Sequence, residues 1–187
     1  MAMTAIGRMA FGNVVEAKVD NFGNHRWGCG LVLSDADVKP LEACVEQAIK
    51  ARKEFDTKFN PTTSPIVPSM SKDENGVKTP VEGEWLVRFD KPLERKGKDG
   101  SLYRQDPPLL WDSLGNVVNG KVKDVPWGSM IKVKFEFYGY NRGAAGVKFE
   151  INGIQIVELA ETDDAPPPID GGWVIEEDTT TELLANA

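Results

Sequence analysis

The chain has 187 residues, of which 41% are hydrophobic, which suits one domain with a tail or two small domains. No apolar run approaches the roughly 20 residues that a membrane-spanning helix needs, and no apolar segment with a cleavage site follows the N-terminus, so we expect neither a membrane span nor a signal peptide. The two cysteines, Cys29 and Cys44, then predict a reducing, cytoplasmic location without a disulfide framework.

The net charge of −7 is unevenly distributed along the chain. Residues 158–187 hold nine of the 29 acids and no Lys or Arg, which leaves 20 acids and 22 bases in residues 1–157. A slightly basic body, at +2, therefore carries a strongly acidic tail. Such asymmetry is typical of an interaction tail. Because the body itself is slightly basic, the overall negative charge does not exclude that the body binds nucleic acid.

Two strands are predicted at the start of the chain. Residues 11–19 form the first and His25–Leu33 the second, with a turn-rich connection at 20–24 that makes the pair a hairpin. Gly28 and Gly30 lie inside the second strand, where glycine permits strong curvature.

A helix is predicted directly after this hairpin, at about residues 35–56. Ser34 is a suitable N-cap, and Asp37 three residues later resembles a capping box. Cys44 lies beside the apolar stripe and is interpreted as buried filler. The stripe comprises Val38, Leu41, Val45, Ala48, Ile49 and Phe55.

The middle of the chain is less regular. Residues 57–80 contain four prolines and little periodicity, which predicts either an ordered excursion or a mobile loop. Residues 84–90 are a third strand, and 107–112 a short extended segment. Between them, residues 91–106 form the most basic loop of the chain, with Lys91, Arg95, Lys96, Lys98 and Arg104.

The most regular pattern is a long β-hairpin within residues 127–159. Its arms, at 129–140 and 147–159, alternate apolar and polar residues, and Asn152-Gly153 predicts a bulge in the second arm. Residues 139–146 are rich in glycine and predict the turn. The predicted core face comprises Ile131, Val133, Phe135, Phe137, Phe149 and Ile151.

These elements predict a mainly β fold: a small antiparallel barrel of the OB type, with one α-helix after the second strand. We expect this domain to span residues 1–159. Residues 160–187 are acidic, rich in Pro and Gly, and predicted to be disordered on their own. An acidic segment with apolar anchors is typical of a tail that docks on a partner. The alternative is a tail that only keeps the protein soluble, with incidental hydrophobic residues.

No motif with a catalytic mechanism is present, so we expect no enzyme activity, no cofactor and no metal. The single histidine, His25, is interpreted as an exposed strand residue. Together with the two cysteines it provides too few ligands for a structural zinc site. Three aspartates beside turn signals could gather around a metal, although turn roles fit them better: Asp90, Asp112 and Asp124.

Binding chemistry remains, because aromatic residues repeatedly lie beside cations. The predicted DNA-binding residues are Lys132, Lys134, Tyr138, Tyr140 and Arg142 of the long hairpin, and Arg95, Lys96, Lys98, Tyr103 and Arg104 of the basic loop. The same pattern also fits any half-exposed sheet. Trp85 and Trp111 can each be either a core residue or a ring that stacks on a base, and the sequence does not decide between the two.

The chain resembles phage-encoded single-stranded DNA-binding proteins of the OB-fold type. The resemblance covers most of residues 11–159 and rests on WGCGLVLS followed by ADVKPLEACVEQAIKA, on SLYRQDPPLLWDSLGNVV, on WGSMIKVKFEFYGY, and on the closing strand from Gly143 to Leu159. It implies sequence-tolerant binding of single-stranded DNA in phage replication, recombination and repair, in the host cytoplasm, and it is compatible with a homodimer.

The resemblance further implies that the acidic tail docks on replication proteins, such as a polymerase or a helicase-primase, and competes with DNA. Related tails often end in an aromatic residue, whereas this chain ends in LLANA. Trp173 is an alternative anchor. The predicted partner-binding residues are Trp173, Glu176, Glu177, Asp178, Leu183 and Leu184. The rival hypothesis is a non-enzymatic interaction module, such as a virion or assembly adaptor, that works through this tail.

Overall fold

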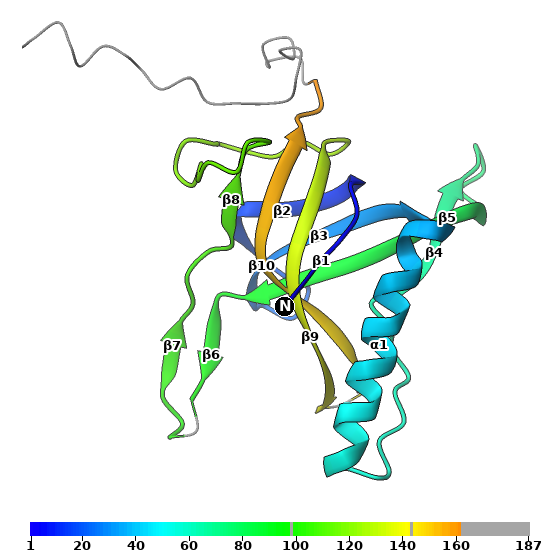
Figure 1. Cartoon of the computed structure of the whole chain (residues 1–187), viewed down its shortest axis with the longest axis vertical. Coiled ribbons are helices and arrows are strands. Elements are labelled where there is room, and N and C mark those ends of the chain that lie inside the picture. The colour runs from blue at the N-terminus through cyan, green and yellow to red at the C-terminus, as the bar shows by residue number, and fades with distance from the viewer. Residues whose placement is uncertain (98, 143, 162–187) are drawn as a thin grey trace, which may run out of the picture.

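Five long strands close into a barrel in the computed structural model, which describes residues 1–97, 99–142 and 144–161 (Figure 1). These strands are β2 (Gly7–Val19), β3 (His25–Ser34), β5 (Lys78–Pro92), β9 (Met130–Arg142) and β10 (Ala144–Glu158). Around the ring the order is β2, β3, β5, β10 and β9, and β9 closes the ring by pairing with β2.

The pairing directions identify the barrel. The neighbours in the ring are antiparallel except β5 and β10, which run parallel where Asp90 stands opposite Glu150. A five-stranded, partly open barrel of this connectivity is the OB fold. Helix α1 (Asp35–Phe55) follows β3, as predicted, and a short strand β1 (Ala2–Met3) adds to the edge of β9.

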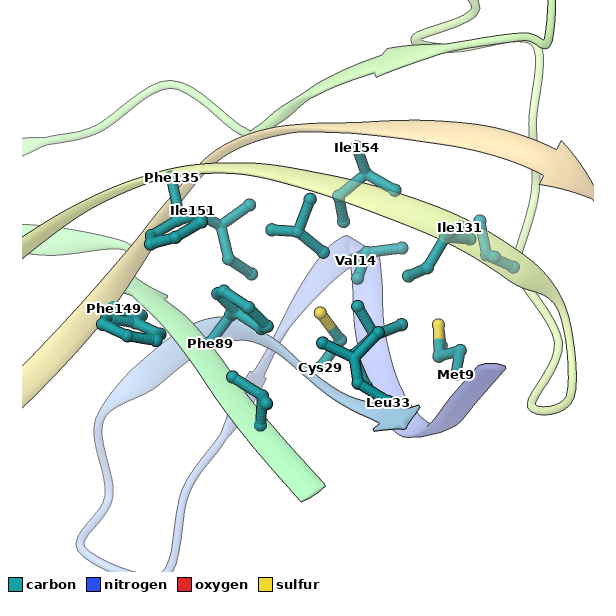
Figure 2. Packing of buried hydrophobic residues seen from close by; sticks show 14 of the residues in the cluster. Met9, Val14, Cys29, Leu33, Phe89, Ile131, Phe135, Phe149, Ile151 and Ile154 are labelled. Carbon is teal, nitrogen blue, oxygen red and sulfur yellow. The ribbon is translucent and has the colours of Figure 1, made fainter. Parts of the chain in front are cut away.

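The barrel is filled by the alternating apolar residues that the sequence indicates (Figure 2). Phe89, Phe135 and Phe149 form its aromatic centre, with ring centroids 4.8–5.7 Å apart. Ile131 and Val133 are fully buried, whereas Phe137 is only partly buried at the edge of the core. The aliphatic residues around them extend this core along the barrel axis: Met9, Val14, Leu31, Leu33, Val87, Ile151, Ile154 and Ile156.

Helix α1 begins where its capping residues predict. The Ser34 hydroxyl accepts a hydrogen bond from the Asp37 backbone N–H at 3.3 Å and donates one to the Asp37 carboxylate at 2.7 Å. Cys44 packs against the core but is only half-buried. The helix lies along one side of the barrel (Figure 1), and Gly139 of β9 makes room for it, because a Cβ there would lie 2.8 Å from the Cβ of Arg52.

Two local features go beyond or differ from what the sequence predicts. Residues 57–80 contain strand β4 (Ile66–Lys72), which pairs with a β5 that already begins at Lys78. Its one proline, Pro68, is tolerated because β4 pairs only with β5 and so lies at a sheet edge. Residues 139–146 are not an open turn either, since the β9–β10 ladder continues to the pair Arg142 and Ala144. The predicted bulge at Asn152-Gly153 is confirmed by a register shift between Ile151 and Gly153.

The connection from β5 to β9 holds three short strands. The predicted basic loop is a two-stranded arm of β6 (Glu94–Lys96) and β7 (Leu102–Arg104), which projects from the barrel in Figure 1. The predicted extended segment is β8 (Leu109–Trp111), parallel to β10. No helix of the described residues is long and apolar enough to cross a membrane.

Candidate nucleic-acid interface

A row of three outward-facing residues crosses β2, β3 and β5. The ladder register pairs Phe11 with Gly30 and Gly30 with Arg88. A Cβ on Gly30 would lie 2.3 Å from a Phe11 ring atom, so the ring lies across the bare glycine. Phe11 remains 39% exposed. Arg88 is exposed and forms no ion pair with any residue that the structure describes.

A groove of about 310 Å³ runs beside this row. Val32 and Leu86, the next outward pair on β3 and β5, form part of its apolar floor. The β4 side contributes Met70 and Lys72, and Lys78 comes from the start of β5. The groove therefore combines apolar surface for ring faces with cations for phosphates.

The neighbouring row carries acids whose charge is compensated. Asp90 of β5 forms ion pairs with Lys148 of β10 and, at 3.0 Å, with Arg26 of β3. Arg26 also binds Asp20 in the β2–β3 turn at 2.8 Å. The pKa of Asp20 lies below its usual value, chiefly because the Asn24 backbone N–H donates to its carboxylate. This part of the barrel surface therefore presents no excess negative charge to a phosphate backbone.

Glu150 anchors the projecting arm to the barrel. Its side chain is 8% exposed, and it accepts a hydrogen bond from the Tyr138 hydroxyl at 2.9 Å and pairs with Arg95 of β6. Burial, and then the negative charge of Glu150, raise the pKa of Tyr138 above its ordinary value. Arg95 and Tyr138 are thus brought together, as two of the predicted site residues, but they act as a structural tie.

A second aromatic ring covers a glycine near the end of the long hairpin. Tyr140 stands opposite Gly146, and a Cβ on that glycine would lie 2.9 Å from the Tyr140 ring. The Tyr140 hydroxyl is 2.8 Å from the Thr63 hydroxyl, which holds the ring in place. Tyr140 is therefore a fixed ring, but it lies near the hairpin end of β9, whereas β9 meets β2 at its other end, at Met130 and Ile131.

The other predicted residues fall into separate groups. Lys96, Tyr103 and Arg104 are exposed on the arm, where a mobile phosphate backbone can reach them. Lys134 instead lies beside β8, with its ammonium 5.8 Å from the centre of the Trp111 ring, and Lys132 stands opposite Gln155 near the same strand. Lys98 and the Arg142 side chain lie outside the described residues, as does the whole predicted tail site.

Phe11 and Arg88 are candidate residues that sequence reasoning missed. The sequence pattern that could have indicated them is Gly28-x-Gly30, which we interpreted only as allowing the strand to curve. The structure shows the additional use of Gly30, since an outward glycine in a ladder leaves space for a ring from the adjacent strand.

The aspartates considered for a metal have other roles. Asp112 closes a turn by accepting hydrogen bonds from the backbone N–H groups of Leu114 and Asn116, both at 2.9 Å. Burial acts to raise the pKa of Asp112, but these bonds and those from the Asn116 side chain outweigh it and lower the pKa. No group of His, Cys, Asp or Glu in the described ranges is arranged to hold a metal ion.

The comparisons with known proteins concern the fold. No family model and no curated protein sequence matches the chain. The solved structure of the single-stranded DNA-binding protein encoded by bacteriophage T7 is similar, with a TM-score of 0.62, 19% identity, and coverage of 89% of this chain and 97% of that one.

The single-stranded DNA-binding protein of bacteriophage Enc34, solved in complex with single-stranded DNA, is similar with a TM-score of 0.58, 10% identity, and coverage of 88% of this chain and 87% of that one. The predicted resemblance to phage single-stranded DNA-binding proteins is therefore confirmed at the level of the fold.

Proposed function

We propose that this protein binds single-stranded DNA with little sequence preference, on the outer surface of β2, β3 and β5 and along the β6–β7 arm. The observation that carries the proposal is the row of Phe11, Gly30 and Arg88, which sets an exposed ring beside an unpaired cation. An exposed ring stacks on any base, and a cation neutralises a phosphate without reading sequence.

The fold supports this location. OB barrels bind oligonucleotides on the face of their second and third strands, which are β3 and β5 here, and with the loops at either end. The fold likeness to two phage single-stranded DNA-binding proteins, one of them in complex with DNA, adds support from outside the chain.

The charges favour a single strand over a duplex. The cations of this surface that have no ion-pair partner among the described residues are few and spread out: Arg88, Lys72, Lys78, Lys96 and Arg104. The rings that separate them need unstacked bases, which a duplex does not offer.

We further propose that residues 160–187 compete with DNA for this surface and dock replication partners through Trp173 or Leu183 and Leu184. The support is the charge split, with a body of +2 and a tail that holds acids and no bases. On this proposal the protein acts in phage replication, recombination and repair, and a partner frees the surface for DNA when it takes up the tail.

The test is a fluorescence anisotropy titration of the full chain with labelled oligo-dT and with a duplex of the same length. We expect tight binding of oligo-dT at low salt that weakens steadily as salt rises, and much weaker duplex binding. An absence of binding at low salt, or equal affinity for the duplex, would contradict the proposal.

A further inference from the structure

The groove beside the Phe11 row lies between two strands that are not neighbours in the sheet. The strand order β2, β3, β5, β4 places Phe11 of β2 at one side of the groove and Met70 of β4 at the other. Val32 of β3 and Leu86 of β5 form the floor between them. Adjacent strands lie about 4.8 Å apart, so β2 and β4 are separated by roughly 14 Å across this floor.

The outer end of the β4–β5 hairpin, residues 70–80, belongs to the same groove. The ladder shifts register between Pro68 and Met70, and Gly83 on the β5 side adopts a φ of +74°. A shifted register bends the strand that carries it. Residues of this outer end line the groove together with Phe11, so the bend brings the hairpin end to the outer surface of the barrel.

Two lysines stand directly opposite each other at this outer end. Lys72 and Lys78 are paired in the ladder, are exposed, and both line the groove. Neither forms an ion pair with any residue that the structure describes. Like charges in a directly opposed pair destabilise a sheet. An anion beside the two ammonium groups would relieve this repulsion, and every phosphate of a nucleic-acid strand carries a negative charge.

We propose that the Phe11 row and the outer end of the β4–β5 hairpin form a clamp that holds one nucleotide of the bound strand. The base lies between the Phe11 ring and the Met70 side chain, and the adjoining phosphates lie at Lys72 and Lys78. The inference rests on the proposed DNA-binding function and deepens it, since it makes Met70 a base contact.

The two side chains of the clamp are accessible to a base. Phe11 is 39% exposed and Met70 is 49% exposed, although both line the groove. An exposed aromatic ring stacks on any base, and a methionine thioether makes favourable contacts with aromatic rings. The clamp therefore needs no particular base, in keeping with binding of little sequence preference.

Oxidation of methionine by hydrogen peroxide reports on the clamp, because a base that covers Met70 shields its sulfur. The full chain is oxidised with and without oligo-dT at saturation, which anisotropy verifies, and each methionine is followed by mass spectrometry. We expect oligo-dT to slow the oxidation of Met70 severalfold. Met3 of β1 is the matched control, since it is 50% exposed and pairs with Lys134 of β9, outside the groove. Its rate should not change.

A double-mutant cycle tests whether Phe11 and Met70 hold the same base. We expect Met70→Ala to raise the Kd for oligo-dT about two- to tenfold, the range of one contact between sulfur and an aromatic ring, and Met3→Ala to leave it unchanged. Met70→Leu keeps an apolar side chain and should retain most of the affinity. The double variant Phe11→Ala/Met70→Ala should lose less than the product of the two single factors, because loss of either side chain already frees the base from the other.

The outcomes separate this inference from the proposed function. Oxidation of Met70 that saturating oligo-dT does not slow overturns the clamp and leaves DNA binding standing. A folded double variant whose two losses simply multiply overturns the clamp in the same way. A wild-type protein that does not bind oligo-dT at low salt rejects DNA binding itself, and the clamp with it.

Discussion

Replacing Phe11 by Ala removes the ring that lies across Gly30 and should weaken single-strand binding strongly. Stacking of one base on an exposed ring contributes about 1–3 kcal/mol, which corresponds to an increase in Kd of about 5- to 150-fold. The ring is 39% exposed and lies outside the barrel core, so its loss should cost only about 1 kcal/mol of folding free energy.

The assay is an anisotropy titration of Phe11→Ala with labelled oligo-dT, beside a urea melt that verifies folding. Phe55→Ala is the matched control, since Phe55 at the end of α1 is 87% exposed and lies on the helix. We expect Phe55→Ala to bind like the wild type. If Phe11→Ala, folded, bound oligo-dT as tightly as Phe55→Ala, the stacking role of the Phe11 row would be refuted.

Three further predictions concern charge and ionisation. Arg88→Ala should make the negative slope of log K against log salt shallower by about 0.7, the value for one lost phosphate contact on a single strand. Lys39→Ala on the helix is the control and should leave the slope unchanged. An unchanged slope in Arg88→Ala would exclude Arg88 from the interface. Because the raised pKa of Tyr138 keeps it protonated in the folded state, stability should fall as pH rises above its ordinary pKa of 10.0, and Tyr138→Phe should flatten that fall in urea melts; equal curves would contradict this. Removing residues 162–187 deletes seven acids and no base but keeps the bond from the Ala160 N–H to Ser129, so oligo-dT binding should tighten, most of all at low salt; unchanged or weaker binding counts against competition by the tail.

The barrel core could be predicted because its signals are local. Alternation along residues 129–159 places Ile131, Val133 and Phe135 inside, and all three are fully buried. The helix start at Ser34 and the bulge at Asn152-Gly153 also follow from residue types at fixed spacing. In each case the residue and its structural consequence lie within a few positions of one another.

The missed features depend on contacts between distant segments. Strand β4 exists because it pairs with the extended β5, and its sequence, broken by Pro68, shows no alternation. Gly139 and Gly146 look like turn residues, yet they remain in the ladder and make room for α1 and for the Tyr140 ring.

The candidate site shows the same division. The arm residues Tyr103 and Arg104 were predicted from composition and are exposed, so they remain candidates for DNA contact. Arg95 was predicted for the same reason, but it pairs with Glu150, which lies 55 residues further along the chain. Phe11 gains its place only through Gly30 of the next strand. Sequence spacing carries no information about such partners.

Photo-cross-linking tests most directly where a single strand lies on this protein. An oligonucleotide with 5-iodouracil in place of thymine is bound to the full chain and the complex is irradiated. The cross-linked residues of the protein are then identified by mass spectrometry. We predict cross-links in β2 at Phe11 and in the β6–β7 arm at Tyr103, because stacked aromatic rings lie against the bases. Cross-links confined to α1, or to the segment after β8 at residues 112–125, would contradict the account.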